Sequence, residues 1–158
     1  MFKNFVEGSI NMRLWHYRLI PMLPNKMLVS QWRECIAIKR QWEKGTLKHR
    51  LVSYVTEYTK EFFLNYVQLV TFYMKERKIK YNQKYYTEIF DFCDNEMDYE
   101  NRQRLVYYPE HNDRYLKQCY YNLEEKADRG IISEEEWQPI QNFWDKFMKE
   151  KSIEENDE

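Results

Sequence analysis

The sequence has little glycine, proline or cysteine, and it contains no long apolar run. Only three glycines occur in 158 residues, and none forms a glycine-rich phosphate loop, which argues against a nucleotide-binding α/β fold. Three widely spaced cysteines are an odd number without a Cys-x-x-Cys pair, so neither a disulfide framework nor a zinc site is expected. The histidines, His16, His49 and His111, are too scattered to suggest a metal site. We therefore expect no metal, no cofactor and a reducing cytoplasm.

The N-terminal residues 1–11 do not resemble a targeting segment. They carry charges at Lys3 and Glu7 and lack a long apolar centre, so neither a signal peptide nor a membrane span is expected.

The net charge of −1 conceals an uneven distribution of charge along the chain. Residues 13–50 hold nine lysines and arginines but only two glutamates, whereas the remainder is acidic. The basic segment is the part expected to meet a polyanion. Residues 150–158 contain five acids and one lysine, and such a charge run predicts a disordered acidic tail at 151–158.

Hydrophobic spacing predicts an all-α protein, a compact single domain of packed helices around a long central helix, occupying residues 12–150. No strand pattern of comparable strength occurs. The expected helices run from an Asn25 N-cap to Lys44 before Gly45, from 47 to 77 with a possible break at 57–60, from 84 to 92, from an Asn112 or Asp113 cap to 128, and onward from a Ser133–Glu136 capping box.

The helix ending at Lys44 has two distinct faces. Its inward face is expected to comprise Leu28, Trp32, Cys35, Ile36 and Trp42. A separate basic face carries Lys26, Arg33, Ala37, Arg40 and Lys44. On the helical wheel Glu34 lies beside Met27 and Ile38, at the edge of the apolar face. We therefore expect Glu34 to be partly desolvated, with a raised pKa suited to acid–base chemistry. The plainer alternative is a boundary glutamate bonded to a neighbouring arginine.

Two short stretches carry a family resemblance. The first is Met12-Arg13-Leu14-Trp15 and the second is Gln31-Trp32-Arg33-Glu34, with 21 residues between Arg13 and Glu34. In these stretches and their spacing the chain resembles the small bacterial relatives of the phage-type pyrimidine-dimer DNA glycosylases. The resemblance extends to about Asp128 and is strongest from Met12 to Gly45.

The resemblance implies a nucleophile and a catalytic carboxylate. In that family an N-terminal α-amine attacks the sugar C1′, the damaged base is expelled, and an imine forms that permits strand cleavage, assisted by a glutamate that corresponds to Glu34. An α-amine suits this role because its pKa of about 7.7 to 8.0 leaves much of it unprotonated near neutrality. The family's amine-bearing residue falls on Arg13, where the phage enzymes have threonine. Arginine is too large for ordinary methionine removal, so the amine is expected on Met12.

This interpretation requires the chain to start near Met12. We expect residues 1–11 to be a non-native or disordered extension, because they would leave no amine near Glu34. Glu7 and Gly8 are encoded by purine-rich codons of the ribosome-binding type a short distance before Met12.

The resemblance also implies a DNA-binding surface. Arg33 corresponds to a DNA-contacting arginine of the family, and Lys126 falls within a matching Leu-Glu-Glu-Lys stretch. With Lys26, Arg40 and Lys44, Arg33 could neutralise several phosphates, although an ordinary solvated helix face fits the same pattern. His16 is included because it lies close to the expected amine.

The leading hypothesis is a monomeric DNA-repair glycosylase with abasic-site lyase activity, acting on damaged pyrimidines in double-stranded DNA. The runner-up is a non-catalytic helical DNA-binding or interaction protein that keeps the scaffold. A third possibility is a structural helical protein whose basic region meets an acidic partner other than DNA.

Overall fold

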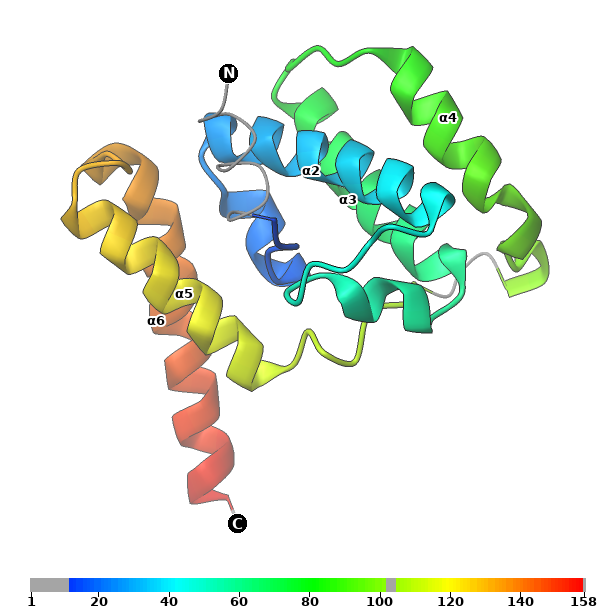
Figure 1. The fold of residues 1–158 in the computed structure, drawn as a ribbon. Coiled ribbons are helices and arrows are strands. Elements are labelled where there is room, and N and C mark those ends of the chain that lie inside the picture. The colour runs from blue at the N-terminus through cyan, green and yellow to red at the C-terminus, as the bar shows by residue number, and fades with distance from the viewer. Residues whose placement is uncertain (1–11, 102–104, 158) are drawn as a thin grey trace.

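A computed structural model describes residues 12–101 and 105–157 of the chain. All regular secondary structure in these ranges is helical, which confirms the all-α class (Figure 1). The residues expected to form an N-terminal extension, 1–11, lie outside the described residues. With η for a 3-10 helix, the elements are η1 (Tyr17–Met22), α2 (Asn25–Lys44), η2 (Ser53–Glu57), α3 (Lys60–Glu76), α4 (Gln83–Cys93), η3 (Asp94–Glu96), η4 (Tyr99–Asn101), α5 (Asp113–Asp128) and α6 (Glu134–Asn156).

Helix α2 has the expected length, but its N-cap differs from the prediction. Pro24, in a non-helical conformation, is the N-cap, and Asn25 is the first helical residue. The Asn25 side chain accepts a hydrogen bond from Arg77 instead of capping the helix. Gly45 ends α2 as predicted, because its φ of 71° is a left-handed conformation that glycine adopts without strain.

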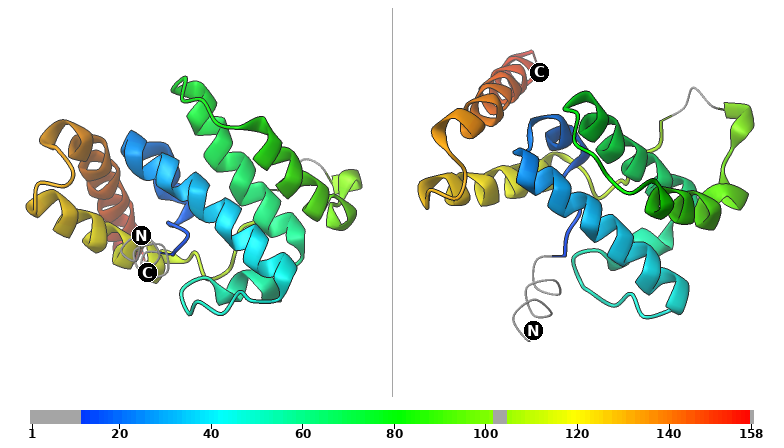
Figure 2. Two further views of the ribbon diagram at one scale, coloured as in Figure 1. Left: turned by 45° about the horizontal axis from the view of Figure 1, so that its top comes forward. Right: turned by 90° about the horizontal axis from the view of Figure 1, so that it is seen from above.

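The centre of the fold is α3, which packs against both α2 and α4. Phe63, Leu64 and Val67 are fully buried on its inner face. The helical region expected from 47 to 77 is broken as anticipated near Glu57, but its first half contains only the short η2. Figure 2 shows α2, α3 and α4 side by side, with α5 and α6 as a separate pair.

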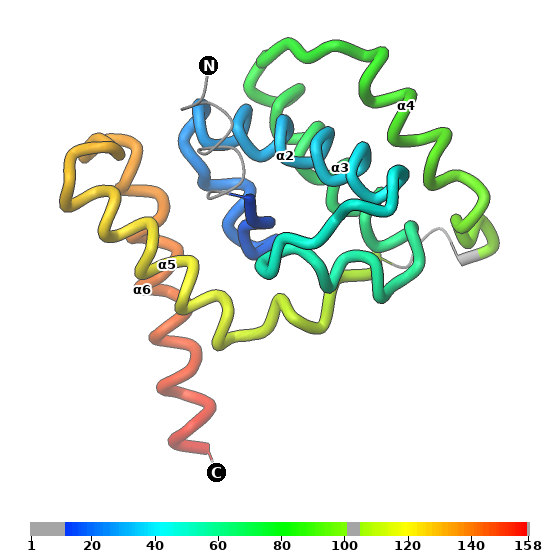
Figure 3. The backbone as a smooth tube through the Cα atoms, viewed as in Figure 1, coloured from blue at the N-terminus to red at the C-terminus, as the bar shows by residue number. Residues whose placement is uncertain are grey.

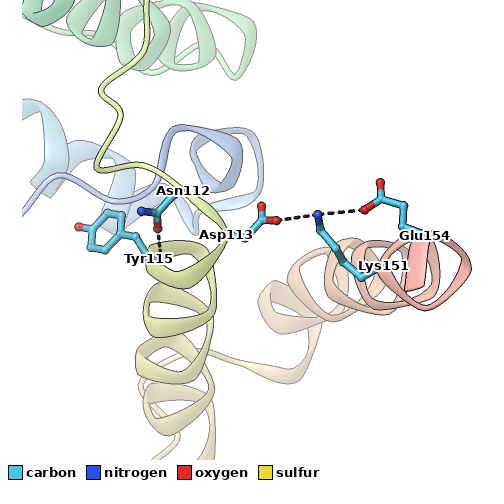
Figure 4. A network of polar contacts seen from close by, with 5 residues as sticks. All are labelled: Asn112, Asp113, Tyr115, Lys151 and Glu154. Atoms are coloured by element: carbon cyan, nitrogen blue, oxygen red, sulfur yellow. Dashed lines mark hydrogen bonds and ion pairs between the residues drawn. The ribbon is translucent and has the colours of Figure 1, made fainter. Parts of the chain in front are cut away.

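The α5–α6 pair is defined by its caps. The Asn112 side chain accepts a hydrogen bond from the Tyr115 N–H, and Ser133 with Glu136 forms the predicted capping box. Helix α6 continues to Asn156, so the prediction of disorder is wrong for residues 151–156. Lys151 explains part of this order, since its ammonium lies 2.6 Å from Asp113 of α5 (Figure 4).

Helix η1 and the segment leading into it lie between the two groups of helices, as the dark blue part of the tube in Figure 3 shows. Helix η1 packs against both α3 and α6. The Arg18 guanidinium lies over the rings of Phe143 and Phe147 of α6. Tyr115 of α5 donates a hydrogen bond to the Leu14 carbonyl oxygen at 2.5 Å. Within the described part of the chain, no helix is both long and apolar enough to cross a membrane.

His16 and His111 are buried at this junction and packed against each other. His111 Nδ1 accepts a hydrogen bond from the Tyr17 N–H, and Nε2 lies 2.8 Å from the Tyr54 hydroxyl. If His111 were protonated, its Nδ1 would carry a hydrogen that points at the Tyr17 N–H, and the hydrogen bond between them would be lost. Burial lowers the pKa of His16 to about 4 and that of His111 to about 3.

The two histidines predict acid sensitivity. Because their folded-state pKa values lie below the ordinary value, stability is retained above pH 6.5 and lost as pH falls toward 4. Between pH 7 and 4.5 each ring should reduce the free energy of unfolding by about 2 kcal/mol. Urea unfolding at both pH values measures this, and His111→Gln should shrink the difference by about 2 kcal/mol.

The matched control is the same change at His49, whose ring is more exposed and lies outside the junction. An unchanged pH difference in His111→Gln would contradict this assignment.

Candidate active site

The site begins with the non-helical segment that precedes η1 and lies against α2. The backbone nitrogen of Arg13 donates to Glu34 Oε2 at 3.2 Å, across 21 residues of sequence. The Gln31 side chain donates to the same oxygen at 3.1 Å. Residue 13 is therefore held directly beside the carboxylate that the sequence singled out.

Glu34 is largely removed from water. Burial raises its pKa to about 7, and the hydrogen bonds from the Arg13 N–H and Gln31 moderate the rise, as does the positive charge of Arg13. This agrees with the position expected for Glu34 at the edge of the apolar face of α2. A carboxyl group with a pKa near neutrality is present in both protonation states, so it can give up or accept a proton under physiological conditions.

Glu34 opens into a cavity of about 490 Å³. The cavity is bounded by the segment at residue 13, by α2 and by α5. The residues that line it are Arg13, Trp15, Lys26, Met27, Ser30, Gln31, Arg33, Glu34, Asn122, Lys126 and Ile131. Four cationic side chains thus surround one carboxylate, which favours a polyanionic ligand.

The structure brings five of the predicted site residues together. Arg13, Lys26, Arg33 and Glu34 come from the N-terminal segment and α2, and Lys126 reaches the cavity from α5. Lys126 lies 92 positions beyond Glu34 in the sequence, so their meeting depends on the packing of the α5–α6 pair.

Four other predicted residues lie outside the cavity. Arg40 and Lys44 are exposed farther along α2, and the Arg40 guanidinium covers the Tyr85 ring. Met12 is only 3% exposed and is part of the hydrophobic core. His16 is only 2% exposed, with Nδ1 accepting from the Arg18 N–H. Its assignment to a DNA-binding surface is corrected here, because a buried neutral ring cannot reach a phosphate.

Sequence reasoning missed Gln31, Asn122 and Ile131. Gln31 carried a signal, since it is a polar residue one turn before Glu34 that shares helical spacing with the apolar Leu28 and Cys35. No comparable local signal marked Asn122 or Ile131, which enter the cavity wall from α5 and the turn after it.

Among the described residues, no group of three or more histidine, cysteine, aspartate or glutamate side chains is placed to hold a metal ion.

The helices thus hold a basic cavity around one partly desolvated carboxylate. Such a site is suited to acid–base chemistry on a polyanion. Residues 12–87 match the model of the family described as pyrimidine dimer DNA glycosylase. This match supports the resemblance noted in the sequence and is in line with a repair function of the DNA glycosylase type. No curated protein and no solved structure shows a significant match to the chain.

The buried Glu34 predicts a pH-dependent effect of Glu34→Gln on stability. Because the folded-state pKa is raised, the parent loses stability as pH rises from 4.5 to about 7, where the buried carboxyl group ionises. Glutamine keeps an acceptor for the Arg13 N–H and does not titrate. Relative to the parent, Glu34→Gln should gain about 2 kcal/mol between pH 5 and pH 8.

Urea unfolding of both proteins at each pH measures this gain. The same substitution at exposed Glu57 serves as the control. An equal effect at the two pH values would show that Glu34 is not desolvated.

Proposed function

We propose that the protein is a DNA glycosylase with associated abasic-site lyase activity that acts as a monomer on damaged pyrimidines in duplex DNA in the cytoplasm. Its nucleophile is the α-amine of a chain that begins at Met12 or Arg13, and Glu34 assists. The distance of 3.2 Å between the Arg13 backbone nitrogen and Glu34 Oε2 is the single observation that carries this proposal.

The position of this nitrogen suits covalent catalysis. A neutral amine there would form a bond to C1′ of the sugar while the bond from C1′ to the base breaks and the base leaves with a proton. Opening of the sugar ring then gives an imine, and removal of a C2′ proton expels the 3′ phosphate. With a pKa of about 7, Glu34 can assist these proton transfers and stabilise positive charge that develops on the sugar.

The cationic wall of the cavity suits the substrate. Lys26, Arg33 and Lys126 can hold phosphates on either side of an extruded nucleotide, because C1′ becomes accessible to an amine only when the stack is opened. Arg40 and Lys44 would extend the contact along α2. The proposal does not include His16.

The identity of the first residue decides which atom reacts. In a chain beginning at Arg13, the nitrogen beside Glu34 is itself the amine. In a chain beginning at Met12, the amine is one residue farther out, and the Arg13 nitrogen is a peptide nitrogen that orients it. A peptide nitrogen has no basic lone pair and cannot attack C1′.

The test is trapping with borohydride, which reduces an imine to a stable amine. Chains beginning at Met12 and at Arg13, the latter released from a removable fusion, are incubated with duplex DNA containing one abasic site. We expect at least one to form a covalent adduct, while residues 1–158 with Met1 in place should form none through this site. Glu34→Gln should reduce the trapping rate by about 100-fold, the scale of acid–base assistance.

Glu57→Gln, an exposed glutamate outside the cavity, is the matched control and should trap at the parent rate. Failure of both shortened chains to give an adduct would refute the proposed chemistry. Adduct formation by lysine side chains is separated from the proposed route by peptide mapping of the reduced product.

A second candidate is a non-catalytic DNA-binding protein that retains the scaffold. It is favoured by the four cationic side chains that line the cavity, because they can hold phosphates whether or not an amine lies beside Glu34. The basic cavity would serve this role without chemistry.

Both candidates predict salt-dependent binding to duplex DNA through the cavity wall. Lys126→Ala and Arg33→Ala should each weaken binding and reduce the slope of log affinity against log salt by about one, because one phosphate contact is lost. Titrations by fluorescence anisotropy at several salt concentrations give this slope. Lys149→Ala, an exposed lysine on α6 outside the cavity, should leave it unchanged. Equal slopes for all of these variants would place DNA elsewhere.

A further inference from the structure

Gln31 has every hydrogen-bonding position of its side-chain amide occupied, although it is only 1% exposed. Its Oε1 accepts from the Trp15 N–H at 2.8 Å and from the Tyr66 hydroxyl at 3.0 Å. Its Nε2 donates to the Arg13 carbonyl oxygen at 2.9 Å and to Glu34 Oε2 at 3.1 Å. An amide offers two donors and two acceptor lone pairs, so this environment fixes its orientation.

The four bonds connect both members of the proposed catalytic pair. Gln31 forms hydrogen bonds to the backbone on both sides of Leu14, at the Arg13 carbonyl and the Trp15 N–H. It also donates a hydrogen bond to the Glu34 carboxylate, which lies one turn farther along α2. The relative position of residue 13 and Glu34 is thereby set by one side chain that does not itself reach the Arg13 nitrogen.

The same geometry distinguishes the two oxygens of Glu34. The Arg13 N–H and the Gln31 amide both donate to Oε2, which occupies its two lone pairs. A proton taken up by the carboxylate is therefore directed to Oε1.

We propose that Gln31 is a positioning residue for the proposed reaction, holding residue 13 and the Glu34 carboxylate in reactive register and directing proton exchange to Oε1. This inference rests on the proposed glycosylase and lyase function.

Tyr66 supports Gln31 from α3. Its hydroxyl donates to the Trp15 carbonyl oxygen at 2.6 Å and, in a bifurcated arrangement, to Gln31 Oε1. Tyr66 is only 4% exposed, so this contact is shielded from competing water. Through Tyr66, the position of the N-terminal segment is fixed relative to α3, the central helix of the fold.

The decisive variant is Gln31→Met, which keeps a side chain of similar length without amide hydrogen bonds. In the chain form that traps, we expect the rate to fall by about tenfold or more, as a small misplacement of reacting groups does, while affinity for abasic-site duplex stays within about threefold. Loss of a donor to the carboxylate should also move the pH profile of trapping to higher pH.

Gln68→Met is the matched control, since Gln68 is a partly buried glutamine of α3 bonded to Tyr86 and outside the cavity. A rate and pH profile equal to those of the parent in Gln31→Met would overturn the proposal. So would equal losses in Gln31→Met and Gln68→Met, because they would indicate a general loss of stability.

A measurement on the full chain needs neither activity nor a stable variant. Nuclear magnetic resonance can follow the Glu34 carboxyl carbon, the Gln31 side-chain NH₂ and the Arg13 backbone N–H as pH is raised. All three should titrate with one midpoint near 7, and a Gln31 NH₂ that ignores the ionisation of Glu34 would also overturn the proposal.

The two arms separate this inference from the function on which it rests. Failure of every chain form to give an adduct removes the proposed chemistry, and with it the catalytic meaning of Gln31. If the Gln31 NH₂ and Glu34 nevertheless titrate together, the hydrogen bond between Gln31 and Glu34 would still be established. Adduct formation without co-titration would instead retain the enzyme and reject Gln31.

Discussion

Buried backbone N–H and C=O groups need hydrogen-bond partners, and the segment from Arg13 to Trp15 has no neighbouring strand to supply them. Side chains supply them instead. Glu34 and Gln31 come from α2, Tyr66 from α3 and Tyr115 from α5, and together they bind the N–H or carbonyl of each residue in the segment. The requirement to satisfy three residues of backbone thus draws three helices to one place.

This requirement also creates the electrostatic character of the site. Glu34 is half-buried where it accepts the Arg13 N–H, and its partial desolvation raises its pKa to about 7. The cationic residues then offset a carboxylate that is only partly solvated. The family match ends at residue 87, yet Lys126 and Asn122 of α5 complete the cavity wall. The α5–α6 pair is therefore part of the site as well as part of the fold.

Much of this arrangement could be read from local sequence. The bounds of α2, its left-handed Gly45 terminus and the capping box at Ser133 follow from signals within a few residues. Glu34 was identifiable because its position on the helical wheel and its distance from Arg13 in sequence agree. Local signals also misled where tertiary contacts intervened, since Arg77 takes the Asn25 side chain away from its capping role.

The remaining parts of the site depend on contacts between distant residues. A helical wheel says which residues share a face of α2, but not that Gln31 would meet the backbone of residues 13 and 15. Nor does it say that Lys126 would cross to Glu34. His16 was misassigned for the same reason, because it is buried against residues distant in sequence, among them His111 and, on α5, Tyr115.

The side-chain hydrogen bonds to residues 13 to 15 have a consequence for the proteolysis of a chain that is shortened to this segment. An aminopeptidase degrades a terminus by drawing its first peptide groups into an extended, unpaired conformation. Here the carbonyl oxygens of Arg13, Leu14 and Trp15 are all held by side chains of helices. Exopeptidase trimming that reached this segment would stall at its edge, so a terminal amine formed there would be protected from removal.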